Sequence, residues 1–131
     1  ATRPTLEDGQ HLARVLLDRY GDDLPTAVFA HNDLMALGAL GVFGEHGLQC
    51  PGDISIIGYN DSLGMDHVDP PLTTVAYPGI EVGRAAGELA LTVARGDSLP
   101  KAGVLIRSEL RIRQSTAAPR RAAARRLLPP R

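Results

Sequence analysis

The spacing of apolar residues predicts three helices along this chain. Residues 12–20 carry apolar side chains at intervals of three and four, and Thr5 stands where a helix-capping residue would precede them. A second helix is predicted over residues 34–46, where Gly47 and the apolar residue after it indicate a Schellman-type end. A third amphipathic helix is predicted over residues 80–95, before a glycine.

Short apolar runs between these helices predict strands. Residues 26–30 (TAVFA) and 54–59 (ISIIGY) are continuous runs bounded by turn residues, as in strands buried on both faces. Residues 70–77 (PPLTTVAY) predict a third strand, and the alternation over residues 104–114 is typical of an antiparallel or edge strand. The order helix, strand, helix, strand, strand, helix, strand predicts an α/β fold with a doubly wound, largely parallel sheet.

Composition places limits on the kind of protein. The 131 residues fit one domain, which we expect over residues 1–116. The whole chain has a net charge of −1, but residues 117–131 hold five arginines and no acidic residue, so the rest of the chain is acidic. We predict that residues 117–131 form a disordered tail. A single cysteine, no bilayer-length apolar stretch and no visible export leader favour a soluble cytoplasmic protein with no membrane partner.

The polar residues of greatest interest follow two predicted strands, because open α/β sheets bind ligands at the carboxyl ends of their strands. Asp33 is explained as the cap of the helix that begins after it. Asn32 carries a donor and an acceptor that suit a ligand hydroxyl or ring nitrogen, or it satisfies its own backbone. Asn60 is the corresponding candidate after the next strand, where Asn60 and Asp61 could equally well only shape the loop.

Four stretches together resemble one family. From about residue 5 to 116, the chain resembles lactose-repressor (LacI/GalR) transcriptional regulators in the order and spacing of four stretches. These stretches are AVFAHNDLMALGAL, PGDISIIGYND, VDPPLTTVAY and ELRIRQST. Periplasmic sugar-binding proteins share the architecture, but PPLTTV and RQST favour the repressors. The resemblance implies a periplasmic-binding-protein-like fold, of which this chain supplies the carboxyl-terminal subdomain and part of the amino-terminal one.

The resemblance also implies site residues and a ligand. The family binds a small effector, usually a sugar or a purine, with a sugar favoured here. Its effector-contacting asparagine falls on Asn32, and Asp33 maps to the capping aspartate beside the site. Its second contact, most often an aspartate, falls on Asn60, with Asp61 as a further candidate. This departure puts the family's usual recognition of hydroxyl pairs in doubt, because an amide both donates and accepts. No catalytic residue, metal ligand or cofactor is implied.

A homodimer is the other partner that the resemblance implies. The helix over residues 34–46 is apolar almost all round, so one face can pack on the sheet and another on a partner subunit, unless it is simply buried within one chain. The family's dimer surface falls on five residues of this sequence: Leu37, Gly41, Met65, His67 and Val68. Operator DNA would be reached only through a headpiece that this sequence lacks, and the helix over residues 80–95 lacks the amino-terminal subdomain on which it packs in the family.

Three functions compete at this point. The leading hypothesis is the effector-binding and dimerisation portion of a transcriptional repressor, and the second is a fragment of a periplasmic-type solute-binding protein. The third, an enzyme on a doubly wound sheet, would need a nucleophile elbow or a phosphate-binding loop. Neither G-x-S-x-G nor G-x-x-x-x-G-K-[ST] occurs in the sequence, so we do not expect an enzyme.

Overall fold

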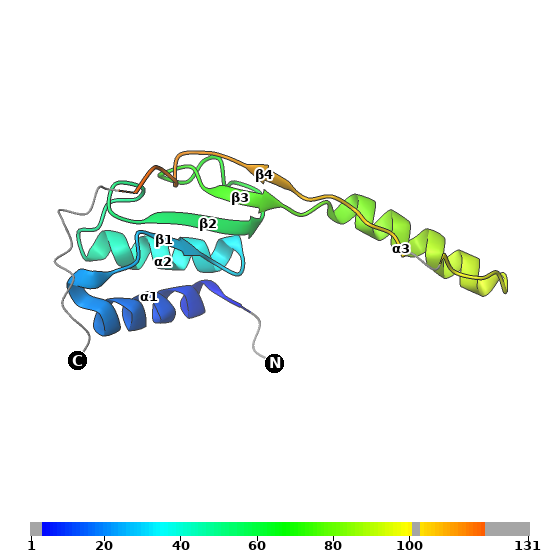
Figure 1. Ribbon diagram of the computed structural model, residues 1–131, viewed down its shortest axis with the longest axis horizontal. Coiled ribbons are helices and arrows are strands. Elements are labelled where there is room, and N and C mark those ends of the chain that lie inside the picture. Colours follow the sequence, from blue (N-terminus) through cyan, green and yellow to red (C-terminus); the bar gives the residue numbers. More distant parts are fainter. Residues whose placement is uncertain (1–3, 101–102, 120–131) are drawn as a thin grey trace, which may run out of the picture.

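The structure is a computed structural model that describes residues 4–100 and 103–119. Its four strands form one sheet in the order β1-β2-β3-β4, in which β1, β2 and β3 run parallel and β4 runs antiparallel to β3 (Figure 1). The mostly parallel sheet is therefore confirmed. The elements are α1 (Leu6–Tyr20), the 3-10 helix η1 (Gly21–Asp23), β1 (Ala27–Phe29), α2 (Asp33–Glu45), β2 (Ser55–Asn60), β3 (Thr73–Ala76), α3 (Gly79–Ala94) and β4 (Glu109–Arg111).

The helix ends follow the sequence signals closely. Thr5 Oγ1 accepts the Asp8 N–H at 3.1 Å while the Asp8 carboxylate accepts the Thr5 N–H at 2.9 Å, which is a complete capping box at the start of α1. At the end of α2 the N–H of Leu48 donates to the carbonyl of Phe43 at 2.9 Å, and Gly47 adopts a φ of +76°. The predicted Schellman-type ending is thus confirmed.

The core lies between α2 and the sheet, with α1 packed on α2. Phe43 and Val42 of α2 meet Ile56 of β2, and all three side chains are fully buried. A Cβ atom added to Gly9 of α1 or to Gly38 of α2 would overlap the backbone of the opposite helix. The two helices therefore cross with their backbones in contact, which only glycine permits at these positions.

Two regions of the described chain expose apolar side chains. Phe29 of β1 remains 62% exposed. The helix α3 projects away from the sheet (Figure 1), and it contains no buried residue. Its apolar residues Ile80 and Leu91 are 87% and 57% exposed.

The carboxyl-terminal segment is shorter as a strand than its alternation suggests. Only Glu109–Arg111 pair with β3, whereas the predicted strand covered residues 104–114. Beyond it Ser115 is buried and Ala117 still donates its N–H to Ser55 Oγ at 3.1 Å. Residues 120–131, most of the predicted disordered tail, lie outside the described residues. Within the described part of the chain, no helix is both long and apolar enough to cross a bilayer.

Candidate functional site

A hollow of about 490 Å³ opens at the carboxyl ends of β1 and β2. It brings together the two asparagines that the strand-end argument singled out, and it adds three rings that could lie against a ligand. Because β1 and β2 are parallel neighbours, residues that follow them meet at one edge of the sheet. The lining residues are Pro4, Phe29, His31, Asn32, Tyr59 and Asn60.

Asn32 is the N-cap of α2, and the predicted cap at Asp33 is wrong. Asn32 Oδ1 accepts the Met35 N–H at 2.8 Å, and Asn32 Nδ2 donates to the carbonyl of Pro4 at 3.0 Å. Its backbone is extended, with φ −151° and ψ 175°, which is the conformation that a capping residue needs. Each amide atom retains one further hydrogen-bonding position for a ligand, because an amide group offers two donor hydrogens and two acceptor lone pairs.

Asp33 is instead the first residue of α2 and is completely buried. Its Oδ1 accepts the hydroxyl of Thr74 at 2.6 Å, and its Oδ2 accepts the N–H of Ser62 at 2.7 Å. A Cβ atom at Gly58 would overlap Asp33 Oδ1, so glycine in β2 makes room for this carboxylate. The charge lies at the helix N-terminus, where the dipole favours it. Asp33 therefore joins the start of α2 to β3 and to the loop after β2.

The loop after β2 has an unusual backbone. Asn60 has φ +114° and Asp61 has φ +56°, both in the left-handed region that asparagine and aspartate tolerate better than most residues. Asn60 is exposed at the hollow, whereas Asp61 is absent from its lining. The Asp61 carboxylate accepts a hydrogen bond from Arg113 at 2.6 Å. The structure brings Asn32 and Asn60 together and assigns the Asp61 carboxylate a partner within the chain.

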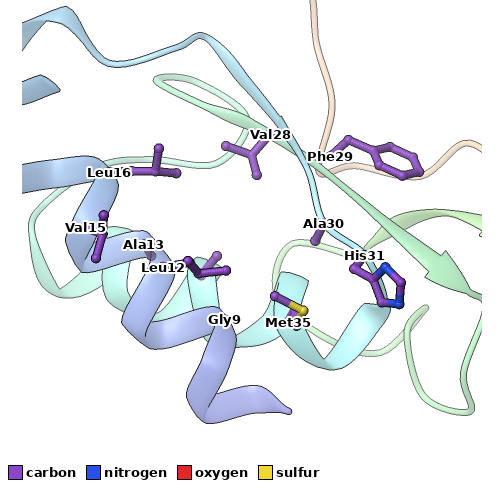
Figure 2. Close-up of a pocket in the computed structure, with 11 residues that line it drawn as sticks. Gly9, Leu12, Ala13, Val15, Leu16, Val28, Phe29, Ala30, His31 and Met35 are labelled. Atoms are coloured by element: carbon purple, nitrogen blue, oxygen red, sulfur yellow. The ribbon is translucent and has the colours of Figure 1, made fainter. Parts of the chain in front are cut away.

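An apolar pocket of about 390 Å³, which the sequence pattern does not predict, lies beside the hollow. Figure 2 shows side chains of α1 on one side of it and of β1 on the other. It shares Phe29 and His31 with the polar hollow. The available signal was the apolar stripe of α1, whose Leu12 and Val15 remain 49% and 41% exposed. An apolar stripe that is only half covered marks a surface against which the described residues do not pack fully.

The five residues expected at a dimer surface differ in burial and fall into three groups. Gly41 and His67 are exposed, and Leu37 and Val68 are half-buried. Met65 is only 6% exposed and belongs to the core, so little of its side chain is left for contact with a partner subunit.

The burial of Met65 has a local cause. Its carbonyl accepts the Leu72 N–H at 2.8 Å, which draws the loop inward. His67 stays outside, where its ring lies 2.7 Å from the Asp66 carboxylate and lowers the pKa of that carboxyl.

The described residues offer no catalytic centre that we can identify. Burial raises the pKa of the Cys50 thiol, which keeps it protonated and weakly nucleophilic at neutral pH. Among residues 4–100 and 103–119, no three histidine, cysteine or acidic side chains gather as a metal site would require. The hollow at the strand ends is lined by rings and by the amides of Asn32 and Asn60.

Comparison with known proteins identifies the family of this chain. The periplasmic binding protein-like domain family matches residues 2–116. The chain is similar to the HTH-type transcriptional repressor CytR of Escherichia coli (strain K12), with 44% identity over 114 residues that cover 87% of this chain and 33% of CytR. It thus spans about a third of the length of the curated relatives that it matches.

Solved structures are similar over the same region. The complex of the transcriptional regulator CelR with cellobiose superposes with a TM-score of 0.77 and 35% identity, over 85% of this chain and 33% of that one. The lac repressor dimer bound to operator and the anti-inducer ONPF gives a TM-score of 0.79 and 30% identity, over 87% of this chain and 39% of that one.

The fold is a mostly parallel α/β domain with a hollow at the carboxyl ends of two neighbouring strands, which is where open α/β sheets bind ligands. The chain belongs to the periplasmic binding protein-like domain family, and within it to the LacI-family regulators, of whose effector-binding domain it covers a part.

Proposed function

We propose that this chain is the effector-sensing and dimerisation portion of a cytoplasmic transcriptional regulator, and that a small sugar-like or purine-like effector binds in the hollow at the ends of β1 and β2. The observation that carries the proposal is the convergence of Asn32 and Asn60, from two neighbouring strands, on that hollow. Operator DNA would be bound by a headpiece elsewhere in a longer protein. The relatives are transcriptional regulators rather than enzymes or transport components.

The chemistry of the lining supports a neutral ligand that both donates and accepts hydrogen bonds. Asn60 and Asn32 offer amide donors and acceptors, and none of the described residues that line the hollow carries a carboxylate. Phe29 and Tyr59 add ring faces, against which the apolar face of a sugar or the plane of a base could pack. His31 adds a ring that can donate or accept according to its tautomer.

Asn60 is the clearest test of this site. Asn60→Gly removes the side chain while permitting the positive φ, and it should weaken effector binding by the value of one hydrogen bond, about 0.5–1.5 kcal/mol. Asn60→Asp should shift preference toward hydroxyl-rich sugars, because a carboxylate accepts from two hydroxyls. Calorimetric titration of the full-length protein with cellobiose, lactose and adenosine measures both effects.

The matched control is Gln114→Ala, which removes an exposed amide that does not line the hollow. It should leave affinity unchanged. If Asn60→Gly and Asn60→Asp bind every one of these compounds as the wild type does, Asn60 only shapes the loop and the proposed site is wrong.

The dimer surface can be tested at Gly41 without disturbing the fold. A Cβ atom at Gly41 would meet nothing within 4 Å, so Gly41→Arg fits in the protomer. Across an interface the same side chain places a charge against apolar surface, and we expect dimer dissociation to rise at least about ten-fold. Sedimentation of the full-length protein measures the dissociation constant. Gly52→Arg, in the exposed turn before β2, is the control, and equal sedimentation of both variants would exclude this surface.

A further inference from the structure

The turn that follows β2 requires support from outside its own backbone. Asn60 and Asp61 both adopt positive φ, which side chains other than glycine adopt only at an energetic cost. Asn60 is the residue that presents its amide at the hollow, so its direction depends on this turn. The contacts that hold the turn should therefore affect how well the Asn60 amide can bind a ligand in the hollow.

Besides the N–H of Tyr77, which donates to the Asn60 carbonyl at 3.4 Å, three hydrogen bonds of Asp61 and Ser62 hold the turn. The Asp61 N–H approaches Thr74 Oγ1 of β3 at 3.4 Å, and the Ser62 N–H donates to the buried Asp33 carboxylate at 2.7 Å. The third is the ion pair of Asp61 with Arg113, which joins Arg113 Nη2 to Asp61 Oδ1 at 2.6 Å across 52 residues of sequence. It is the only one of the three in which both partners are charged.

Arg113 is itself fixed at three points. Besides the pair with Asp61, its Nη1 donates to the carbonyl of Leu72 at 2.8 Å, and its backbone N–H donates to Thr73 Oγ1 at 2.9 Å. The side chains of the ion pair are only 20% and 23% exposed, so water screens their attraction less than that of a surface pair. The neighbouring pair on β4, Arg111 with Glu109, is 50% and 66% exposed and lies at 3.1 Å.

We propose that Arg113 is a positioning residue for the effector contact at Asn60: it holds Asp61 in the left-handed conformation that directs Asn60 into the hollow. The inference rests on the proposed function, because it takes Asn60 as a ligand contact. It also links the hollow to the segment that follows β4. Asp61 thereby acts through the loop rather than by contact with the effector.

The first test measures the loop without any ligand. Arg113→Gln removes the positive charge and the guanidinium donors. Arg113→Lys keeps the charge but has one donor nitrogen in place of Nη1 and Nη2, which contact Leu72 and Asp61. Hydrogen exchange by mass spectrometry of the full-length protein should show about ten-fold faster exchange in peptides that cover Asp61 and Ser62 for Arg113→Gln, and less for Arg113→Lys. The control Arg111→Gln removes the exposed pair and should leave these peptides unchanged. Unchanged exchange in Arg113→Gln overturns the inference.

The second test asks whether Arg113 acts through Asn60. Cellobiose, lactose and adenosine are titrated into the wild type, Arg113→Gln, Asn60→Gly and the double variant. For a compound that the wild type binds, Arg113→Gln should weaken binding about ten-fold in the wild-type background and less than about two-fold in the Asn60→Gly background. Equal losses in both backgrounds would mean a general structural role and would overturn the inference. Unchanged affinity in Asn60→Gly contradicts the proposed site instead, and the exchange result then still decides whether Arg113 holds the loop.

Discussion

Replacing Gly38 by alanine should lower the free energy of unfolding by about 1–3 kcal/mol, although helix propensity alone would predict a gain. The new Cβ atom would overlap the backbone carbonyl of Leu6, where α1 crosses α2. Backbone cannot rotate aside as a side chain does, so the helices must separate and lose buried contact. Equilibrium unfolding in urea measures the change.

Gly44→Ala is the matched control on the same helix. A Cβ atom there meets nothing within 4 Å, and the position is exposed. Alanine should therefore raise the free energy of unfolding by about 0.5–1 kcal/mol. If Gly38→Ala is as stable as Gly44→Ala, the helices do not cross in backbone contact.

Asp33→Ala should lower the free energy of unfolding by about 3 kcal/mol, because the buried Thr74 hydroxyl and the part-buried Ser62 N–H both lose their acceptor. The Thr74 hydroxyl and the Ser62 N–H both point at a carboxylate that is fully buried. The same unfolding measurement applies. A loss below about 0.5 kcal/mol would show that water replaces the carboxylate without cost.

Two further variants divide this effect between the two donors. In Asp33→Asn the amide oxygen can still accept from Ser62, and the amide N–H can donate to the Thr74 oxygen once its hydroxyl rotates, so the loss should be about 1 kcal/mol. Thr74→Val removes one donor while keeping the shape, and it should cost a similar amount. A cost for Asp33→Asn equal to that of Asp33→Ala would contradict this pairing.

The elements were predictable because each one has a sufficient local cause. Thr5 and Asp8 form the start of α1 by themselves, and Gly47 is enough to end α2. The strand β2 is apolar because it lies between β1 and β3. The strand β1 is instead an edge strand of the described sheet, and Ala27 and Phe29 are exposed, so the prediction that residues 26–30 are buried on both faces is wrong. The antiparallel edge strand predicted over residues 104–114 is present but only three residues long, since pairing requires a partner and β3 offers only four residues.

The cap of α2 was predicted at Asp33 but lies at Asn32, because the choice between them depends on contacts distant in the sequence. Both residue types cap helices well, and they are adjacent, so sequence alone cannot choose between them. The choice depends on the space left by Gly58 and on the Thr74 hydroxyl, 41 residues away, which together accept a buried carboxylate.

Part of the site was predictable by topology. Parallel neighbouring strands bring their carboxyl ends together, and this rule is sufficient to place Asn32 beside Asn60. The ion pair of Asp61 with Arg113 was not predictable, since no periodic pattern relates a loop aspartate to an arginine 52 residues later. The apolar pocket between α1 and β1 also depends on packing that the pattern does not specify.

The most direct test of the proposed site is a crystal structure of the full-length protein grown with whichever of cellobiose, lactose or adenosine binds in calorimetry. The prediction is a ligand in the hollow at the ends of β1 and β2, with its polar atoms within hydrogen-bonding distance of the Asn32 and Asn60 amides and a ring face against Phe29 or Tyr59. A ligand bound elsewhere, with the Asn60 amide facing solvent, would contradict the assignment of this hollow as the effector site.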